Sequence, residues 1–156
     1  AWPVPVVRLL TGIAMTLRLG WVYLPGKKQA PLGRKDFAGN PLTQDQRRWN
    51  RDSGVLEKAP QLGSAGPTYG WLSAALKSIA TVRGMKSAKG LKCPVLIVAA
   101  GLDSVVDNDA IRRFSERVAG VSIITIREAL HEILLEKDEI RQQFLAAFDV
   151  FVAEEA

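Results

Sequence analysis

The stretch from Cys93 to His131, CPVLIVAAGLDSVVDNDAIRRFSERVAGVSIITIREALH, decides the fold of this chain. It begins with a compact apolar run at residues 94–100, which is rich in β-branched side chains and bounded by Pro and Gly. Such a run is typical of a strand that is fully buried within a parallel sheet. Residues 121–126 form a second apolar run and predict a second strand.

A helix is predicted between these two strands. Asn108 or Asp109 can cap its N-terminus, and Gly120 closes it. Its apolar positions recur at steps of three and four residues, and they are Ala110, Ile111, Phe114 and Val118. A strand, a crossover helix and a parallel strand form a βαβ unit, in which neighbouring strands lie about 5 Å apart and end at the same edge of the sheet.

Two side chains that can carry chemistry follow these strands. Asp103 comes after the first strand, and His131, the only histidine of the chain, follows the second. Both are expected at the same edge, where open α/β sheets collect catalytic groups and a carboxylate can orient an imidazole. Asp107, Glu128 and Glu132 are competing acids, but Asp103 is preferred because the strand holds it in place.

The residues before this stretch predict a helical layer at 1–88 with no strand signal, followed by a βαβα order at 89–156. A first helix is predicted at 6–23. Its apolar face consists of Val6, Leu10, Ile13, Leu17 and Trp21. This face suits either a lid helix that touches lipid or ordinary packing within the protein, and both interpretations remain open.

Three more helices complete the predicted layout. Thr43-x-x-Gln46 fits a capping box and predicts a helix at 44–58, while Pro67 can open a helix that Gly84 ends. The apolar face of the latter comprises Trp71, Leu72, Ala75, Leu76, Ile79 and Val82. The last helix, at 138–152, has an apolar face for packing against the sheet. That face comprises Ile140, Phe144, Ala147, Phe148 and Phe151.

Four segments carry a resemblance to a known family. GLDSVV at 101–106 and ALHEILLEKDEIRQQFLAAFDVF at 129–151 resemble the last third of a serine α/β-hydrolase, in particular of the bacterial lysophospholipase and monoglyceride-lipase branch. NPLTQD at 40–45 and GPTYGWL at 66–72 are similar to cap-region segments of that branch. The resemblance implies an α/β fold in which the C-terminal part of an α/β-hydrolase core follows a helical cap or lid at 1–88.

The resemblance also implies acyl transfer through a Ser-His-Asp triad, with His131 as general base and then acid, and Asp103 as its orienting carboxylate. The implied activity is hydrolysis of carboxylic esters, with lysophospholipid or monoacylglycerol as substrate and no cofactor. Trp21, Tyr69 and Trp71 suit an acyl chain as substrate-binding residues, although aromatic side chains at helical spacing more often belong to a core.

The nucleophile is the departure from this pattern. Such enzymes hold it in a G-x-S-x-G elbow between a strand and a helix, and the sequence contains no such string. The nearest approach, Gly63-Ser64-Ala65-Gly66, has the wrong spacing and follows no apolar run. The serine is therefore expected upstream of Ala1, in a longer protein of which this chain is a fragment. The alternative is a catalytically dead interaction or regulatory module of the same fold.

Composition narrows the range of partners. The chain has 156 residues, 47% of them apolar, and a net charge of +5. Its basic residues are dispersed and no nucleic-acid motif is present, so nucleic acid is not expected, whereas peripheral contact with an anionic membrane is. The upstream half of the protein or a partner chain is expected to complete the sheet, because two strands alone leave open edges.

Charge and cysteine content bear on location and metal binding. Arg8 and Arg18 within the first predicted helix argue against a membrane span, so the expected location is the cytoplasm, with peripheral contact at the inner membrane face. Cys93 has no partner for an intrachain disulfide and is predicted to be buried. One His and one Cys do not suffice for a zinc site.

Overall fold

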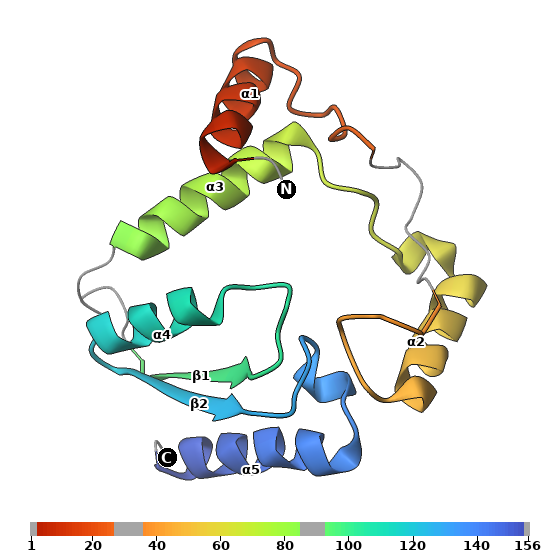
Figure 1. Ribbon diagram of the computed structural model, residues 1–156, viewed down its shortest axis with the longest axis vertical. Helices are drawn as coiled ribbons and strands as arrows, with labels where there is room; N and C mark the ends of the chain where they lie inside the picture. Colours follow the sequence, from red (N-terminus) through yellow and green to blue (C-terminus); the bar gives the residue numbers. More distant parts are fainter. Residues whose placement is uncertain (1–2, 27–35, 85–92, 155–156) are drawn as a thin grey trace. The chain divides into compact units, whose positions relative to one another are not determined.

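The computed structural model describes residues 3–26, 36–84 and 93–154, which form two compact units (Figure 1). The helical unit comprises the described residues up to 26 together with 55–84. The sheet unit comprises 36–54 and 93–154. Residues 36–54, which the sequence pattern grouped with the cap, thus belong with the strands, because they hydrogen-bond to the loop after the second strand.

The sheet unit contains the predicted βαβα order. Strand β1 (Val95–Ala100) and strand β2 (Val121–Ile126) pair in parallel, with Val95 opposite Val121 and Ala100 opposite Ile126. Helix α4 (Asn108–Arg117) connects them, and helix α5 (Asp138–Glu154) follows a short 3₁₀ turn, η2 (Ile133–Leu135). Figure 1 shows α4 and α5 on opposite faces of the strands. The parallel pairing expected from the crossover helix is confirmed.

The core of the sheet unit lies between the ends of the strands and α5. Its buried members are Ala100, Ile126, Ala129 and Ile140, with Val98, Ile133 and Phe144 packed against them. The predicted face of α5 is therefore largely correct, but Phe148 is half exposed. The three predicted apolar positions on α4 are partly buried, and the fourth, Val118, which directly follows the helix, is fully buried.

Strand β1 is less buried than its sequence predicts. Only Ala99 and Ala100 are buried, and Ile124 of β2 is exposed. The described residues contribute only two strands to the sheet, so each strand has one unpaired edge. No further strand covers the side chains next to these edges. Cys93, at the start of β1, is likewise exposed rather than buried.

Helix α1 (Val4–Thr16) ends earlier than predicted and packs through a different face. Arg18 adopts a left-handed backbone conformation with φ of 59°, which stops the helix before Trp21. The buried residues are Thr11 and Ala14, not the predicted apolar face. Small side chains let α1 approach its neighbour closely, and the Thr11 hydroxyl donates a 2.7 Å hydrogen bond to the Val7 carbonyl.

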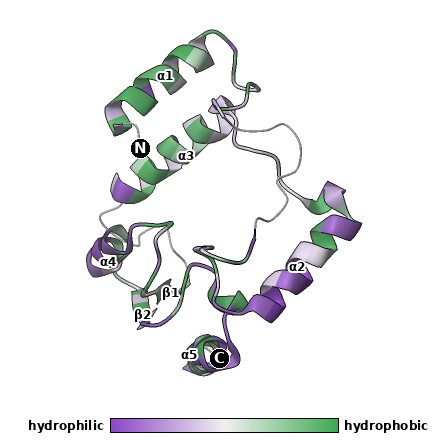
Figure 2. Ribbon diagram, turned by 45° about the vertical axis from the view of Figure 1, so that its right-hand side comes forward, coloured by the Kyte–Doolittle hydropathy of each residue, from purple (hydrophilic) through white to green (hydrophobic). Residues whose placement is uncertain are grey.

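The neighbour of α1 in the helical unit is helix α3 (Tyr69–Gly84), and the 3₁₀ turn η1 (Pro60–Leu62) precedes it. The start of α3 is tied to the segment after α1 by a 2.8 Å hydrogen bond from Gly70 N to Gly20 O. A Cβ on Gly70 would lie 2.8 Å from that oxygen, so glycine is required there. In Figure 2, α1 is mainly hydrophobic, whereas α2 (Gln46–Lys58) is mainly hydrophilic.

Two helix caps differ from the sequence prediction. Asp45, rather than Thr43, caps α2, because the Asp45 carboxylate accepts a 2.9 Å hydrogen bond from Arg48 N. Asp107, rather than Asn108 or Asp109, caps α4 and accepts a 3.0 Å hydrogen bond from Ala110 N. The predicted caps Thr43 and Asn108 instead donate side-chain hydrogen bonds to Leu135 O and Ala100 O.

No helix within residues 3–26, 36–84 and 93–154 is long and apolar enough to cross a bilayer.

Candidate active site

The structure brings the two sequence-predicted site residues together at the carboxyl edge of the sheet. The Nδ1 atom of His131 lies 2.8 Å from the Asp103 Oδ2 atom. The Asp103 side chain is only 4% exposed, whereas that of His131 is 30% exposed. The carboxylate is thus enclosed behind the imidazole, and the imidazole faces outward.

Close contact between the two loops produces this arrangement. Gly101 N donates a 2.8 Å hydrogen bond to Ile126 O, and Leu102 N donates a 2.9 Å hydrogen bond to Ala129 O. These bonds continue the pairing of the strands into the loops that carry the acid and the histidine. A Cβ on Gly101 would lie 2.4 Å from Arg127 O, so only glycine allows the loops to approach this closely.

The surroundings of Asp103 favour its charged form. Burial raises the pKa of this carboxyl, but hydrogen bonds from His131, Val105 N and Val106 N outweigh burial and hold the pKa below its usual value. The two backbone N–H groups lie 2.7 Å and 3.1 Å from Asp103 Oδ1. Asp103 therefore has one oxygen held by the backbone and the other directed at the imidazole.

Asp107, which the sequence left as a competing acid, has a different role. Besides capping α4, it lies 3.5 Å from the Arg113 guanidinium. Its neighbour Asn108 donates a 2.7 Å hydrogen bond from Nδ2 to Ala100 O, the carbonyl at the end of β1. This bond fixes the start of α4 against the strand, so the loop that contains Asp103 is anchored at both ends.

The loop of His131 is held by residues that sequence reasoning missed. Glu132 N donates a 2.8 Å hydrogen bond to Leu42 O, and Leu130 N donates a 2.8 Å hydrogen bond to the Glu136 carboxylate. Glu136 is fully buried and also accepts a 2.9 Å hydrogen bond from Gln44 N. One carboxylate thus joins the segment before α2 to the residue preceding the histidine.

Asn40 and Thr43 shape the segment that meets this loop. The Asn40 side chain accepts hydrogen bonds from Leu42 N and Thr43 N, at 2.9 Å and 3.0 Å, and so holds a tight turn. The Thr43 hydroxyl donates a 2.6 Å hydrogen bond to Leu135 O. The available sequence signal was the string NPLT at 40–43, in which Asn40 precedes a proline, but the segment that it contacts could not be identified from spacing.

The remaining sequence-predicted residues lie elsewhere. Trp21, Tyr69 and Trp71 belong to the helical unit, where Trp21 and Trp71 are exposed and Tyr69 N donates a 3.0 Å hydrogen bond to Val22 O. Ser64 lies in irregular backbone after η1, not between a strand and a helix. Among the residues that the structure describes, no three His, Cys, Asp or Glu side chains are grouped so that they could hold a metal ion.

Comparison with known proteins yields a family match and two relatives by sequence. The sequence profile of the family described as serine aminopeptidase, S33, matches residues 5–138. Lysophospholipase L2 of Escherichia coli strain K12 is 33% identical over 118 residues, which cover 71% of this chain and 34% of that protein. Probable lysophospholipase L2 of Haemophilus influenzae is 28% identical over 113 residues, covering 72% of this chain and 36% of that protein. The chain thus spans about a third of the length of these curated relatives.

A solved structure shares the fold. A soluble variant of monoglyceride lipase from Saccharomyces cerevisiae, in complex with a substrate analog, matches with a TM-score of 0.57. The match covers 98% of this chain and 50% of that chain at 16% sequence identity. At this identity the likeness concerns the fold alone.

Proposed function

The chain belongs to the serine aminopeptidase S33 family of α/β-hydrolases, and from this premise we propose that it supplies the acid and the histidine of a Ser-His-Asp triad. The family match and the solved structure confirm the α/β-hydrolase fold expected from the sequence. The proposed reaction is hydrolysis of a carboxylic ester, with a lysophospholipid or a monoacylglycerol as substrate.

The single observation that carries the proposal is the 2.8 Å contact between His131 Nδ1 and Asp103 Oδ2. An ionised carboxylate can only accept a hydrogen bond, so Nδ1 carries a proton and donates it. In this tautomer Nε2 of the neutral ring is an acceptor. Within the described residues Nε2 has no hydrogen-bond partner, and the outward position of His131 suits a serine hydroxyl at that atom.

The proposed mechanism places the serine upstream, in the part of the relatives that this chain does not span. The serine Oγ atom attacks the ester carbonyl carbon while Nε2 of His131 takes the hydroxyl proton. The tetrahedral intermediate collapses when the same nitrogen returns that proton to the leaving alcohol. Water then attacks the acyl-enzyme in the same way and releases the fatty acid, while Asp103 stabilises the imidazolium in both steps.

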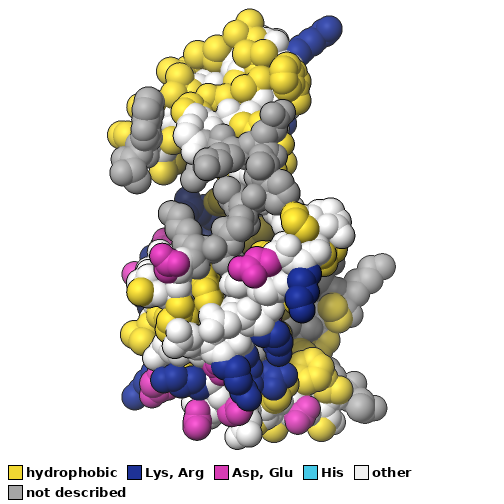
Figure 3. All heavy atoms as spheres, turned by 90° about the vertical axis from the view of Figure 1, so that its right-hand side faces the viewer, with side chains coloured by type: hydrophobic (Ala, Val, Ile, Leu, Met, Phe, Trp, Pro, Cys, Tyr) yellow, Lys and Arg dark blue, Asp and Glu magenta, His cyan; other side chains and the backbone are white. Residues whose placement is uncertain are grey.

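Two features support a lipid-like substrate. The sequence relatives carry the name lysophospholipase L2. In addition, apolar side chains of α1 and of the segment after it are exposed, among them Leu10, Leu17 and Trp21. Figure 3 shows hydrophobic side chains over much of the visible surface of the helical unit. We therefore assign this unit to the cap, where it would contact the acyl chain of the substrate.

The test is made on the whole protein, including its upstream portion. His131→Gln and Asp103→Asn should each lower kcat/KM for lysophosphatidylcholine by about 10³-fold or more, because each disrupts proton transfer from the serine. The matched control is Asp109→Asn, which removes an exposed carboxylate from α4 outside the pair. It should retain nearly all activity.

Two other results would discriminate between a hydrolase with this triad and a catalytically dead module. Activity that survives both changes in the pair would contradict the triad assignment. A whole protein that neither hydrolyses the ester nor reacts with a fluorophosphonate probe would instead support the catalytically dead module.

A further inference from the structure

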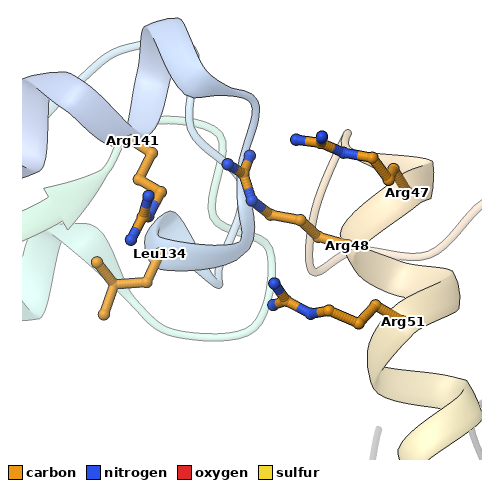
Figure 4. Close-up of a pocket in the computed structure, with 5 residues that line it drawn as sticks. All are labelled: Arg47, Arg48, Arg51, Leu134 and Arg141. Atoms are coloured by element: carbon orange, nitrogen blue, oxygen red, sulfur yellow. The ribbon is translucent and has the colours of Figure 1, made fainter.

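A cavity lined mainly by arginines lies on the sheet unit, and we call it the arginine pocket. Its volume is about 280 Å³, and its lining residues are Arg47, Arg48, Arg51, Leu134 and Arg141. In Figure 4, the arginines of α2 extend toward the turn that carries Leu134, and Arg141 extends from α5. All five residues belong to the same compact unit, so the structure defines how they lie together.

The innermost arginine forms a fixed floor. Arg48 is buried, pairs with Asp45 at 2.8 Å and with Asp138, and donates a further hydrogen bond to Glu136 O. Its charge is therefore balanced within the protein, and its position is set by three partners on two segments.

The outer arginines are much less constrained. The side chains of Arg47 and Arg51 are 77% and 64% exposed, and their nearest carboxylates are Asp138 at 4.0 Å and Asp52 at 3.3 Å. Exposed pairs of this kind contribute little stability. Arg141 has no carboxylate within ion-pair distance among the described residues. Arg47 and Arg51 therefore have only weak, exposed partners, and Arg141 has only a longer-range attraction to Asp138, so an anion could compete for all three guanidinium groups.

This concentration of positive charge is unfavourable for α2 itself. Arg47 and Arg48 lie in the first turn of the helix, where the dipole repels cations, and the carboxylate of the capping residue Asp45 is already engaged by Arg48. Arg47 and Arg51 are four positions apart, a spacing at which like charges destabilise a helix. Figure 3 shows Lys and Arg side chains gathered on the face where α2 lies. A bound anion would relieve the repulsion between Arg47 and Arg51.

We propose that the arginine pocket binds a phosphate group, either free or as part of a phospholipid headgroup. Guanidinium groups form paired hydrogen bonds to phosphate oxygens. Leu134 is half exposed and gives the pocket an apolar wall, which suits the carbon atoms next to a phosphate ester. The proposal concerns binding without turnover, so it stands or falls separately from the proposed hydrolase activity.

The first arm of the test uses inorganic phosphate and the whole protein. At constant ionic strength, phosphate should raise the melting temperature more than chloride does. The double variant Arg51→Gln/Arg141→Gln should weaken phosphate binding about tenfold or more. The matched control is Arg112→Gln/Arg113→Gln, which removes two exposed charges from α4 and should change the Kd by less than about twofold.

The second arm identifies the source of the phosphate. The protein is sedimented with vesicles of phosphatidylcholine, with and without phosphatidylglycerol. A preference for phosphatidylglycerol that is lost in the pocket variant and kept in the control assigns the site to a headgroup. Phosphate binding that depends on the pocket, with equal vesicle binding by both variants, assigns it to free phosphate. The proposal is overturned if phosphate acts no differently from chloride and both double variants bind vesicles equally.

Discussion

Gly101 and Asp103 illustrate how two neighbouring residues have different physical roles at one site. Gly101 has no side chain, and this lets the backbone at Arg127 approach it. Asp103 accepts hydrogen bonds from two backbone N–H groups and faces His131 with its other oxygen. The first residue sets the separation of the loops, and the second provides the charge between them.

Replacing Gly101 with Ala should destabilise the protein by about 1–3 kcal/mol, because the new Cβ would overlap the backbone at Arg127. Urea unfolding measures this change. Gly54→Ala is the matched control within the same unit, since nothing lies within 4 Å of that Cβ position and Gly54 is inside α2. The control should be more stable than wild type by up to about 1 kcal/mol. Equal effects of the two changes would contradict the close-approach argument.

The pKa of Asp103 predicts how stability depends on pH. Its folded-state pKa lies below its ordinary value of about 3.9, so the stabilisation is complete above that value. It is lost as the pH falls through the lower, folded-state pKa. The urea midpoint of wild type should therefore decline more steeply on acidification below about pH 4 than that of Asp103→Asn. Parallel curves would show that the carboxylate contributes no such linkage.

The segment before α2 and the loop after β2 act together as one structural element. The Asn40 turn presents the Leu42 carbonyl to Glu132 N, and the Glu136 carboxylate accepts hydrogen bonds from Gln44 N and Leu130 N. Residues that lie about 90 positions apart thus hold the backbone on either side of His131. A histidine fixed in this way loses little conformational freedom when it receives a proton.

Thr43 offers a direct test of this element. Thr43→Val keeps the shape of the side chain but removes the donor to Leu135 O and the acceptor for Asp45 N, so it should cost about 1–3 kcal/mol of unfolding free energy. Thr43→Ser retains the hydroxyl and loses one methyl group, which should cost about 0.8 kcal/mol. Urea unfolding of both variants decides the matter, and a valine variant as stable as the serine variant would exclude the hydroxyl as a tether.

Helix α1 and the residue that follows it, Leu17, carry exposed apolar side chains whose role can be tested. Changing Leu10 and Leu17 to Ser in the whole protein should lower turnover of micellar lysophospholipid far more than turnover of a short soluble ester, if this face contacts lipid. Both side chains are exposed, so folding should be preserved. The matched control is Thr11→Val, a change on the buried face, which should affect both substrates alike. Equal losses on both substrates, with a lower melting temperature, would identify the Leu10 and Leu17 face as ordinary packing surface.

For the whole molecule, the open sheet is the dominant feature. The described residues provide two parallel strands, and isolated parallel pairs leave unpaired backbone groups on both sides. The relatives are about three times as long as the region matched here. This difference in length is consistent with the proposal made above, in which the additional strands and the nucleophile come from a part of the protein outside this chain.

The isolated chain of 156 residues should accordingly be inactive. We expect neither fluorophosphonate labelling nor hydrolysis of a short aryl ester above background, because serine and oxyanion hole are assigned upstream. The whole protein should do both under the same conditions. Labelling of any serine in the isolated, sequence-verified chain would contradict this assignment.

The sequence alone determined both strands, the crossover helix and the last helix, because each follows from a local pattern of apolar residues. The two strands, the crossover helix and the last helix follow from runs of apolar residues and their spacing, and the handedness and parallel order of a βαβ unit then place Asp103 and His131 at one edge. The α/β-hydrolase resemblance rested partly on the same stretch and partly on the segments at 40–45, 66–72 and 129–151. These features needed no information about distant contacts.

Tertiary structure alone decided the supports of the site. Glu136 reads as one charge among several in HEILLEKD, yet it is buried because its partners come from the segment before α2. The end of α1 at Thr16, before the left-handed Arg18, could not be read from the periodic pattern. Nor could the exposure of its apolar face, since periodicity shows which residues share a face but not which face finds a neighbour. Contacts between segments far apart in sequence depend on three-dimensional packing, and spacing along the chain does not encode them.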